Sequence, residues 1–129
     1  MAPKLPLKAI KLIEGKNFAF LASLMRDGSP HVTPLWVDRE DDVVLVNTSV
    51  GQTTQRNMKR DPRVSIAIVD HDNPYDRVII LGRVKVQSQE GAEEHIDKLA
   101  KKYTGANKYQ RSSPTEKRTT IKIEPTRIL

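Results

Sequence analysis

The chain has 129 residues, of which 37% are hydrophobic and 29% are charged, so its size suits one domain with a modest core. It contains no cysteine, which excludes disulfides, thiolate nucleophiles and cysteine-ligated zinc sites and fits a reducing cytoplasm. The formal net charge is +6, but basic and acidic residues are interleaved and only 5% of residues are aromatic, so we expect no nucleic-acid partner.

The first predicted element is a short amphipathic helix from Leu5 to Glu14. Its apolar side chains recur at helical spacing, and Gly15 provides a stop. Lysines interrupt the apolar residues of this segment, so we expect neither a signal peptide nor a membrane span. The sequence therefore predicts a soluble, cytoplasmic protein.

Strand patterns follow from residue 18 onward. The apolar run at 18–25 (FAFLASLM) predicts a strand, the Asp-Gly pair at 27–28 a tight turn, and His31 to Val37 a return strand. Asp38 to Asp42 predicts a charged turn, and Val43 to Thr48 a third strand rich in β-branched residues. The first half of the chain thus predicts three antiparallel strands.

The polar segment from Asn47 to Val64 joins a strand end, a turn and a short helix. The helix is predicted from Thr53 to Arg60, and the Asp-Pro pair at 61–62 ends it, because a residue before proline disfavours helical geometry. A helix start presents unpaired backbone N–H groups and the positive end of the helix dipole. The hydroxyl groups near this start belong to Thr48, Ser49, Thr53 and Thr54. The segment therefore predicts a phosphate site.

The second half of the chain predicts three more strands and a helix. Val64 to Val69 is a predicted strand, 70–76 a loop, and Arg77 to Val86 a long strand with a bulge or bend at Gly82. Residues 90–103 predict a helix with one apolar face, 106–116 a long loop, and 118–124 a half-buried final strand. The fold predicted from these patterns is mainly β, a small antiparallel β-barrel with two or three helices.

Four sequence blocks occur in an order and at spacings that resemble a known family. They are GSPHVTPLWV at 28–37, VNTSVGQTTQRNMKRDPRV at 46–64, DNPYDRVIILGRV at 72–84 and EGAEEHIDKLAKKYTG at 90–105. From about Leu7 to Leu129 the chain resembles the pyridoxamine 5'-phosphate oxidase-like split β-barrel superfamily, and it is most similar to the branch of oxidoreductases that depend on the deazaflavin coenzyme F420. The resemblance implies a split antiparallel β-barrel with flanking helices, as one domain over residues 1–129.

The resemblance also implies a homodimer that holds F420 or FMN at the subunit interface. The strand from His31 to Leu35 would line the ring system with its backbone, and the segment that starts at Asn47 would meet the ribityl or phosphate region. Arg56 matches the arginine of the family's RN(L/M) motif, and its guanidinium would pair with the phosphate. The implied cofactor-binding residues are His31, Val32, Thr33, Pro34, Asn47, Thr48, Ser49, Thr53, Thr54, Arg56, Tyr75 and Arg77.

Tyr75 and Arg77 lie in the block that reaches the cofactor region in the family, from the same or from the other subunit. One position departs from the family pattern: a lysine usually stands two residues before the RN arginine, and here that residue is Thr54. A threonine hydroxyl can bond phosphate but brings no charge, so the charge would come from Arg56, Lys59 or Arg60.

The function predicted from the resemblance is hydride transfer between F420 or FMN and a small organic substrate. The cofactor would carry the chemistry, so no catalytic residue is named. The alternative is a protein that binds a flavin or deazaflavin without catalysis, or a family member that has lost its cofactor. Trp36 is predicted in the core or at the interface rather than against the ring. The three histidines have no partner at metal-ligand spacing, so no metal site is expected.

Overall fold

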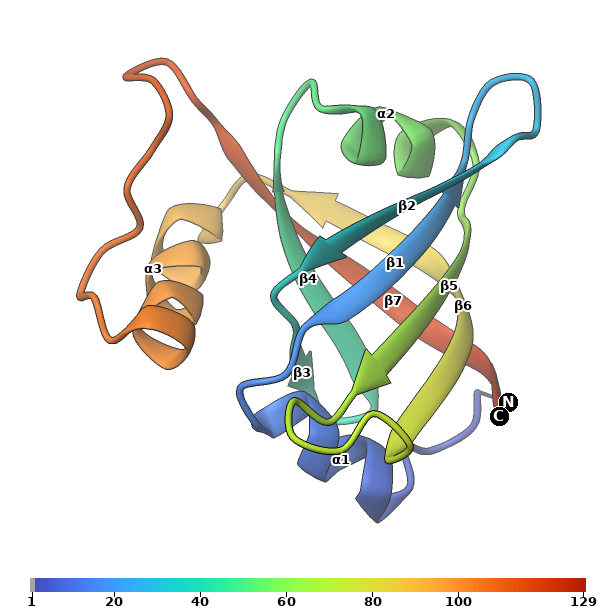
Figure 1. The fold of residues 1–129 in the computed structure, drawn as a ribbon. Helices are drawn as coiled ribbons and strands as arrows, with labels where there is room; N and C mark the ends of the chain where they lie inside the picture. Colours follow the sequence, from blue (N-terminus) through green and yellow to red (C-terminus); the bar gives the residue numbers. More distant parts are fainter. Residues whose placement is uncertain (1) are drawn as a thin grey trace.

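The computed structural model describes residues 2–129, and its ribbon is drawn in Figure 1. Within this range seven strands form one antiparallel sheet in the order β2-β1-β5-β6-β7-β4-β3. The elements in chain order are α1 (Leu7–Glu14), β1 (Ala19–Leu24), β2 (Pro30–Leu35), β3 (Asp38–Glu40), β4 (Val43–Ser49), α2 (Thr53–Arg60), β5 (Arg63–Val69), β6 (Arg77–Ser88), α3 (Ala92–Thr104) and β7 (Arg118–Ile128).

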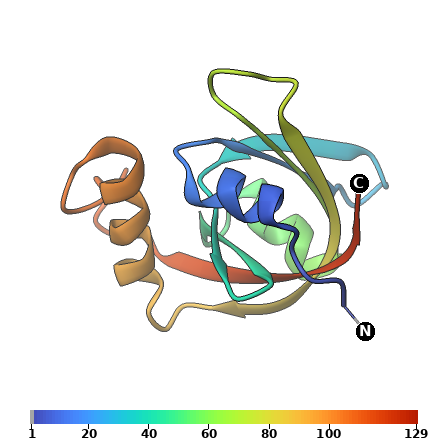
Figure 2. The same cartoon turned by 90° about the horizontal axis from the view of Figure 1, so that it is seen from below.

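The sheet curls around its apolar face into a barrel-like shape (Figure 2). β2 and β3 are its two edges and are not paired with each other, so the barrel is split rather than closed. Helix α1 lies across one open end and α2 across the other, while α3 lies outside the barrel beside β4 and β7 (Figure 1). This arrangement confirms the predicted fold, a split antiparallel β-barrel with flanking helices.

The core fills the inside of the curled sheet. Along β5 the buried residues alternate, so that Val64, Ile66 and Ile68 point inward while their neighbours face out. Ile121 and Ile123 of β7 do the same from the opposite wall. Each fully buried aliphatic side chain of this kind contributes about 1.5–3 kcal/mol. Helix α1 closes one end with its buried residues, which are Ala9, Leu12 and Ile13.

The local predictions agree with most elements, and the differences have physical reasons. The strand register shifts between Leu81 and Gly82, where a bulge or bend was predicted, and the extra residue is Thr126 of the paired strand β7. The predicted charged turn at 38–42 was wrong in part, because Asp38 to Glu40 form the short strand β3, which pairs with β4. The last two strands run further than predicted, to Ser88 and Ile128, since the β6–β7 ladder extends from the Ile80–Ile128 pair to the Ser88–Thr120 pair.

The prediction of three successive antiparallel strands missed the order of the sheet. β1 and β2 form the predicted hairpin, but β4 does not continue it; β4 pairs with β7, more than 65 residues away in sequence, and with β3. The first helix was predicted to begin at Leu5. In the structure it begins two residues later, at Leu7, directly after its N-cap residue Pro6. No helix among residues 2–129 is long and apolar enough to cross a membrane.

We predict that Gly82→Ala destabilises the fold by about 1–3 kcal/mol. A Cβ at this position would lie 2.8 Å from Cγ2 of Ile123 and 2.9 Å from the backbone oxygen of Glu124, and the backbone oxygen cannot move without breaking the bulge. Urea unfolding measures the change. Val86→Ala, at a half-exposed position on the same strand, is the control and is expected to change stability by less than about 1 kcal/mol. Equal stability of Gly82→Ala and the wild type would contradict the assigned register.

Candidate functional site

A cleft of about 270 Å³ lies between edge strand β2 and the wall formed by β4, α2, α3 and β7. Polar groups line one side, and aromatic and aliphatic side chains line the other. The lining residues are Phe18, Thr33, Pro34, Leu35, Trp36, Asn47, Thr48, Gln52, Thr54, Ile96, Tyr109 and Arg118. Residues from six distant segments of the chain therefore meet here.

Arg118, at the start of β7, is the one charged residue among those that line the cleft. Its side chain is only 8% exposed and is held on β4: Nε donates to Oδ1 of Asn47 at 2.9 Å, Nη1 donates to Oγ of Ser49 at 2.8 Å, and Nη2 donates to the backbone oxygen of Asn47 at 3.2 Å. Tyr109 covers the guanidinium, whose carbon lies 4.8 Å from the ring centre. The charge is therefore fixed in the wall of the cleft.

Glu116 neutralises this buried guanidinium. Its Oε2 accepts a hydrogen bond from Nη1 of Arg118 at 2.9 Å, and its Oε1 accepts from the backbone N–H of Ser112 at 3.0 Å and from the Ser112 hydroxyl. Burial would raise the pKa of Glu116, but these bonds from Ser112 and the charge of Arg118 lower it to about 2. Glu116 is thus ionised at neutral pH, and the Arg118–Glu116 pair carries no net charge.

An aromatic cluster forms the other side of the cleft. Trp36 stacks on Tyr103, with ring centres 5.2 Å apart and an interplanar angle of 5°, and Phe18 stacks on Tyr103 at 6.0 Å. Tyr109 meets Trp36 edge to face at 6.1 Å. The stacked geometry contributes about 0.5–1.5 kcal/mol per pair beyond the area it buries. Trp36 follows the last residue of β2 and is half-buried, so it lines the cleft rather than the core.

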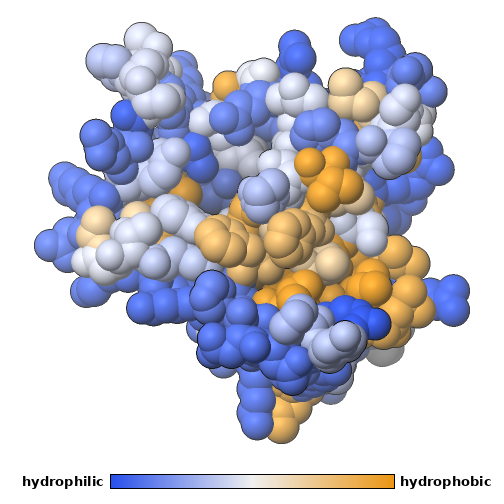
Figure 3. Space-filling model, viewed as in Figure 1, coloured by the Kyte–Doolittle hydropathy of each residue, from blue (hydrophilic) through white to orange (hydrophobic). Residues whose placement is uncertain are grey.

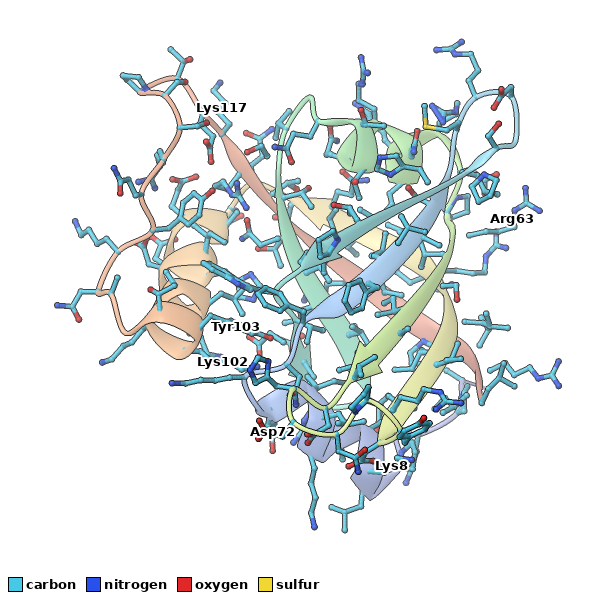
Figure 4. All side chains as sticks on the ribbon, viewed as in Figure 1. Lys8, Arg63, Asp72, Lys102, Tyr103 and Lys117 are labelled. Carbon is cyan, nitrogen blue, oxygen red and sulfur yellow. The ribbon has the colours of Figure 1, made fainter. Side chains whose placement is uncertain are left out.

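The last turn of α3 anchors this cluster to the end of the barrel, as Figure 4 shows for the labelled Lys102 and Tyr103. The Tyr103 hydroxyl donates to the backbone oxygen of Asn17 at 2.7 Å and accepts from the N–H of Val37 at 3.2 Å. Lys102 Nζ donates to the backbone oxygen of Val37 at 3.0 Å and to that of Ile13. Burial raises the pKa of Tyr103 and lowers that of Lys102.

Thr48 provides the cleft with a free hydrogen-bonding group. The residue is 5% exposed, and its Oγ1 is buried with no hydrogen-bond partner among residues 2–129. A buried hydroxyl without a hydrogen-bond partner costs about 1–3 kcal/mol, so such a group usually forms a hydrogen bond to a ligand or a water. Thr54 and Gln52 bring the start of α2 to the same cleft, and this helix has no side-chain cap.

The structure brings five of the twelve predicted site residues into the cleft: Thr33, Pro34, Asn47, Thr48 and Thr54. Ser49 lies behind the wall, where its hydroxyl accepts a bond from Arg118. His31 and Val32 lie further along β2 and do not line the cleft, although Nδ1 of His31 is buried without a partner.

The remaining four predicted residues line two other recesses. Thr53 and Arg56 lie on the far side of α2, in a recess that also holds Arg26, Lys59 and Arg60. Tyr75 and Arg77 line another recess with Ile79, Leu129 and Lys8 of α1, which Figure 4 labels. Within one copy of the chain, therefore, Arg56, Tyr75 and Arg77 do not meet the residues of the cleft.

Sequence reasoning missed the residues that tertiary pairing brings to the cleft. Arg118 begins an alternating strand, where a charged residue is ordinarily exposed, and Tyr109 lies in a polar loop. Ile96 faces the cleft from α3, and its apolar helical spacing indicated only a buried face. No local signal distinguishes these residues, because their role depends on pairing between β4 and β7.

Comparisons with known proteins find one matching family and several solved structures of similar fold. The family described as pyridoxamine 5'-phosphate oxidase matches residues 7–129. An F420 reductase superposes with a TM-score of 0.83 at 24% sequence identity, over 97% of this chain and 98% of that one.

Two further solved structures are similar over nearly the whole chain. A Listeria innocua protein named as a candidate pyridoxamine 5'-phosphate oxidase has a TM-score of 0.71 at 22% identity, over 95% of this chain and 94% of that one. A histidine-to-alanine variant of HupZ from Group A Streptococcus has a TM-score of 0.68 at 23% identity, over 96% of this chain and 97% of that one. At these identities the likeness shows a shared fold.

We predict that the stabilising effect of the Glu116 carboxylate disappears in acid. Its pKa is about 2 in the folded chain against an ordinary value of 4.5, so the contribution of ionised Glu116 is complete above about pH 4.5 and is lost as the pH falls toward 2. Glu116→Gln should therefore be less stable than the wild type at pH 7, by about 1–3 kcal/mol, with the difference shrinking as the pH approaches 3. Urea unfolding followed by Trp36 fluorescence measures this. A stability difference that stays constant with pH would contradict the stabilising role of the ionised Glu116 carboxylate.

Proposed function

The chain belongs to the pyridoxamine 5'-phosphate oxidase family, and from this premise we propose that it is an oxidoreductase that binds F420 or FMN in the cleft beside β2. In this proposal a hydride passes between the cofactor and a small organic substrate. The F420 reductase of the same fold supports the choice of a deazaflavin. The residues that line the cleft also support cofactor binding there.

The main support is the set of unused hydrogen-bonding groups around a cleft that is partly aromatic. Oγ1 of Thr48 is buried there without a partner. β2 is paired only with β1, so every second residue of β2 directs its backbone N–H and C=O away from the sheet. A flavin or deazaflavin ring has polar atoms along its edges and apolar faces. Backbone groups of β2, the Thr48 hydroxyl and the Trp36 side of the cleft are suited to such a ring.

The start of α2 is suited to the phosphate end of the cofactor. The helix has no side-chain cap, so its first N–H groups are available, and Thr54 lines the cleft beside them. Arg56 follows two residues later and therefore projects from the other side of the helix, into the basic recess. In the proposed site the backbone N–H groups and the Thr54 hydroxyl bind the phosphate, and Arg56 adds charge from across the helix.

The protein would orient the cofactor and exclude water, while the bound cofactor supplies the hydride chemistry. Among the described residues that line the cleft, Arg118 is the one ionised group, and its charge is balanced by Glu116. No aspartate, glutamate, histidine or lysine of residues 2–129 lines the cleft, so in this proposal the proton that accompanies hydride transfer comes from solvent. Leu35, Ile96 and Trp36 provide the apolar surface that shields the ring.

The absence of aspartate, glutamate, histidine and lysine from the described cleft lining also suits the second candidate, a carrier that binds the cofactor without catalysis. The two candidates differ in one measurable property. An oxidoreductase oxidises reduced F420 or FMN at a rate that depends on the concentration of an added organic acceptor. A carrier binds the cofactor with no such dependence.

We also propose that the chain forms a homodimer through the outer face of β2, β1, β5 and β6. Pro34, Phe20, Ala67 and Ile79 are successive cross-strand partners, so their side chains share one face, and Phe20 is 41% exposed on it. Figure 3 shows hydrophobic surface gathered on this side of the molecule. Exposed apolar patches of this kind mark interaction surfaces. Phe18 and Pro34 join the patch to the mouth of the cleft, so a second copy would cover the bound ring.

We predict that the purified protein binds F420 or FMN and that Thr48→Val weakens binding about fivefold, the effect of one lost hydrogen bond. Valine has nearly the shape of threonine, so the cleft keeps its size. Fluorescence titration of each cofactor measures the affinity. Thr126→Val, at an exposed position of β7, is the matched control and should bind like the wild type. Failure of both cofactors to bind at micromolar concentration would overturn the proposed function.

We predict that Phe20→Glu converts the dimer to a monomer, because the new carboxylate would be buried against the partner's apolar face. Sedimentation velocity measures the mass in solution. Val86→Glu places the same charge at a similarly exposed valine outside this face and should leave the dimer intact. A wild-type chain that sediments as a monomer at micromolar concentration would contradict the proposed interface.

A further inference from the structure

The side-chain amide of Asn47 is fixed in the cleft wall by two contacts. Oδ1 accepts the hydrogen bond from Nε of Arg118 at 2.9 Å, and Nδ2 donates to the backbone oxygen of Ala92 at 2.9 Å. An arginine nitrogen can only donate and a backbone oxygen can only accept, so these neighbours determine which end of the amide is oxygen. Asn47 cannot be turned over without losing both bonds.

This orientation of the amide determines which ring nitrogen of neutral His95, on α3, carries the proton. Nδ2 of Asn47 lies 3.2 Å from Nδ1 of His95, and because Nδ2 is a donor, Nδ1 must be the acceptor. The ring proton of neutral His95 is therefore on Nε2, which lies 3.2 Å from Oδ2 of Asp38. A directed chain of hydrogen bonds thus runs from Asp38 through His95 and Asn47 to Arg118.

Asp38 is ionised in this chain. Partial burial alone would raise its pKa, but hydrogen bonds from His95, from the backbone N–H of Arg39 and from Lys98 hold the pKa well below its usual range. Lys98 Nζ lies 3.3 Å from the same Oδ2 and is largely exposed. The carboxylate therefore holds the Nε2–H tautomer of His95 in place.

We propose that Asp38 and His95 are a positioning pair: neutral His95 supplies the third contact that holds the Asn47 amide, and through it the Nε side of Arg118, in the cleft wall, and protonation of His95 removes that contact. Ligand binding in the cleft then weakens as His95 gains a proton. The statement about ligand binding rests on the proposed function, whereas the statement about Asn47 concerns the protein alone.

Protonation removes the acceptor that Asn47 uses. Imidazolium carries N–H on both ring nitrogens, so Nδ1–H would face the Asn47 N–H at 3.2 Å, donor against donor. The other acceptor near Nδ1 is Oγ1 of Thr120, at 3.4 Å. His95 would turn toward Thr120, and Asn47 would lose one of the contacts that hold it against Arg118.

The charged groups around His95 come from the elements packed on it. β3 supplies Asp38, in contact with the ring, and Glu40, which pairs with Lys122 of β7 at 3.1 Å. α3 supplies Lys98 and Lys102, and β7 supplies Arg118, which pairs with Glu116. The Asp38 carboxylate favours imidazolium and the surrounding cations oppose it.

The test is a pH titration of the ¹⁵N-labelled protein without cofactor, followed by NMR. The expected result is that His95 carries its neutral-state proton on Nε2 and that the Asn47 side-chain amide signals move with the same midpoint as His95. His95→Gln should abolish the Asn47 transition. An Asn47 amide that stays still while His95 titrates, or a neutral His95 with its proton on Nδ1, would overturn the proposal.

Two further variants keep the test decisive. His71→Gln removes an exposed histidine and should leave the Asn47 transition unchanged. Asp38→Asn preserves shape and should move the His95 and Asn47 transitions together to lower pH, so it decides the matter even where His95→Gln does not fold. Separate movement of the two transitions in Asp38→Asn would contradict a positioning pair.

The ligand measurement uses FMN and F420 themselves. Across the His95 transition the wild-type affinity should fall about fivefold more than that of His95→Gln, the effect of one lost hydrogen bond, because titration of the cofactor's own phosphate is common to both proteins. If neither cofactor binds at any pH, the proposed function fails while the NMR result still decides the positioning of Asn47. Equal pH profiles for the wild type and His95→Gln would overturn the link to binding.

Discussion

The buried guanidinium of Arg118 is the constraint around which the cleft is built. A charge that leaves water costs several kcal/mol unless every donor finds a partner. The donors of Arg118 form hydrogen bonds to two residues of β4 and to Glu116, which lies in the loop before β7. The same contacts join β4 to β7, strands that are not neighbours in sequence, and fix Tyr109 over the guanidinium. The wall of the cleft thus follows from satisfying one charged side chain.

The parts of the fold that were predictable from sequence are those that depend on local patterns. The bulge at Gly82 and the helix from Thr53 to Arg60 have signals within a few residues. β3 had no such signal, because its three polar residues become a strand only by pairing with β4. The order of the sheet likewise depends on contacts between the two ends of the chain. Sequence patterns limit what each segment can form, and tertiary pairing decides which segments meet.

The same distinction separates the predicted and missed residues of the cleft. Thr48 and Thr54 were found because a strand end and a helix start lie close together in sequence. Asn47 was predicted beside them as a ligand, yet its amide is occupied by Arg118, Ala92 and His95, while the hydroxyl of Thr48 has no partner. Which of two adjacent polar residues remains free for a ligand cannot be derived from residue type. It depends on the groups that α3 and β7 bring to them.

The position of Arg77 gives the proposed dimer a chemical consequence. Arg77 pairs with Val69 and is two residues before Ile79, so its side chain lies on the same outer face as Phe20 and Ile79. Within one copy it lines a separate recess and contributes nothing to the cleft. In the proposed dimer Arg77 would lie in the interface, and the family resemblance implies that it reaches the cofactor region of the other copy. The lysine that Thr54 replaces in the family pattern would then have a substitute from the partner, and cofactor binding would depend on assembly as well as on the residues of a single chain.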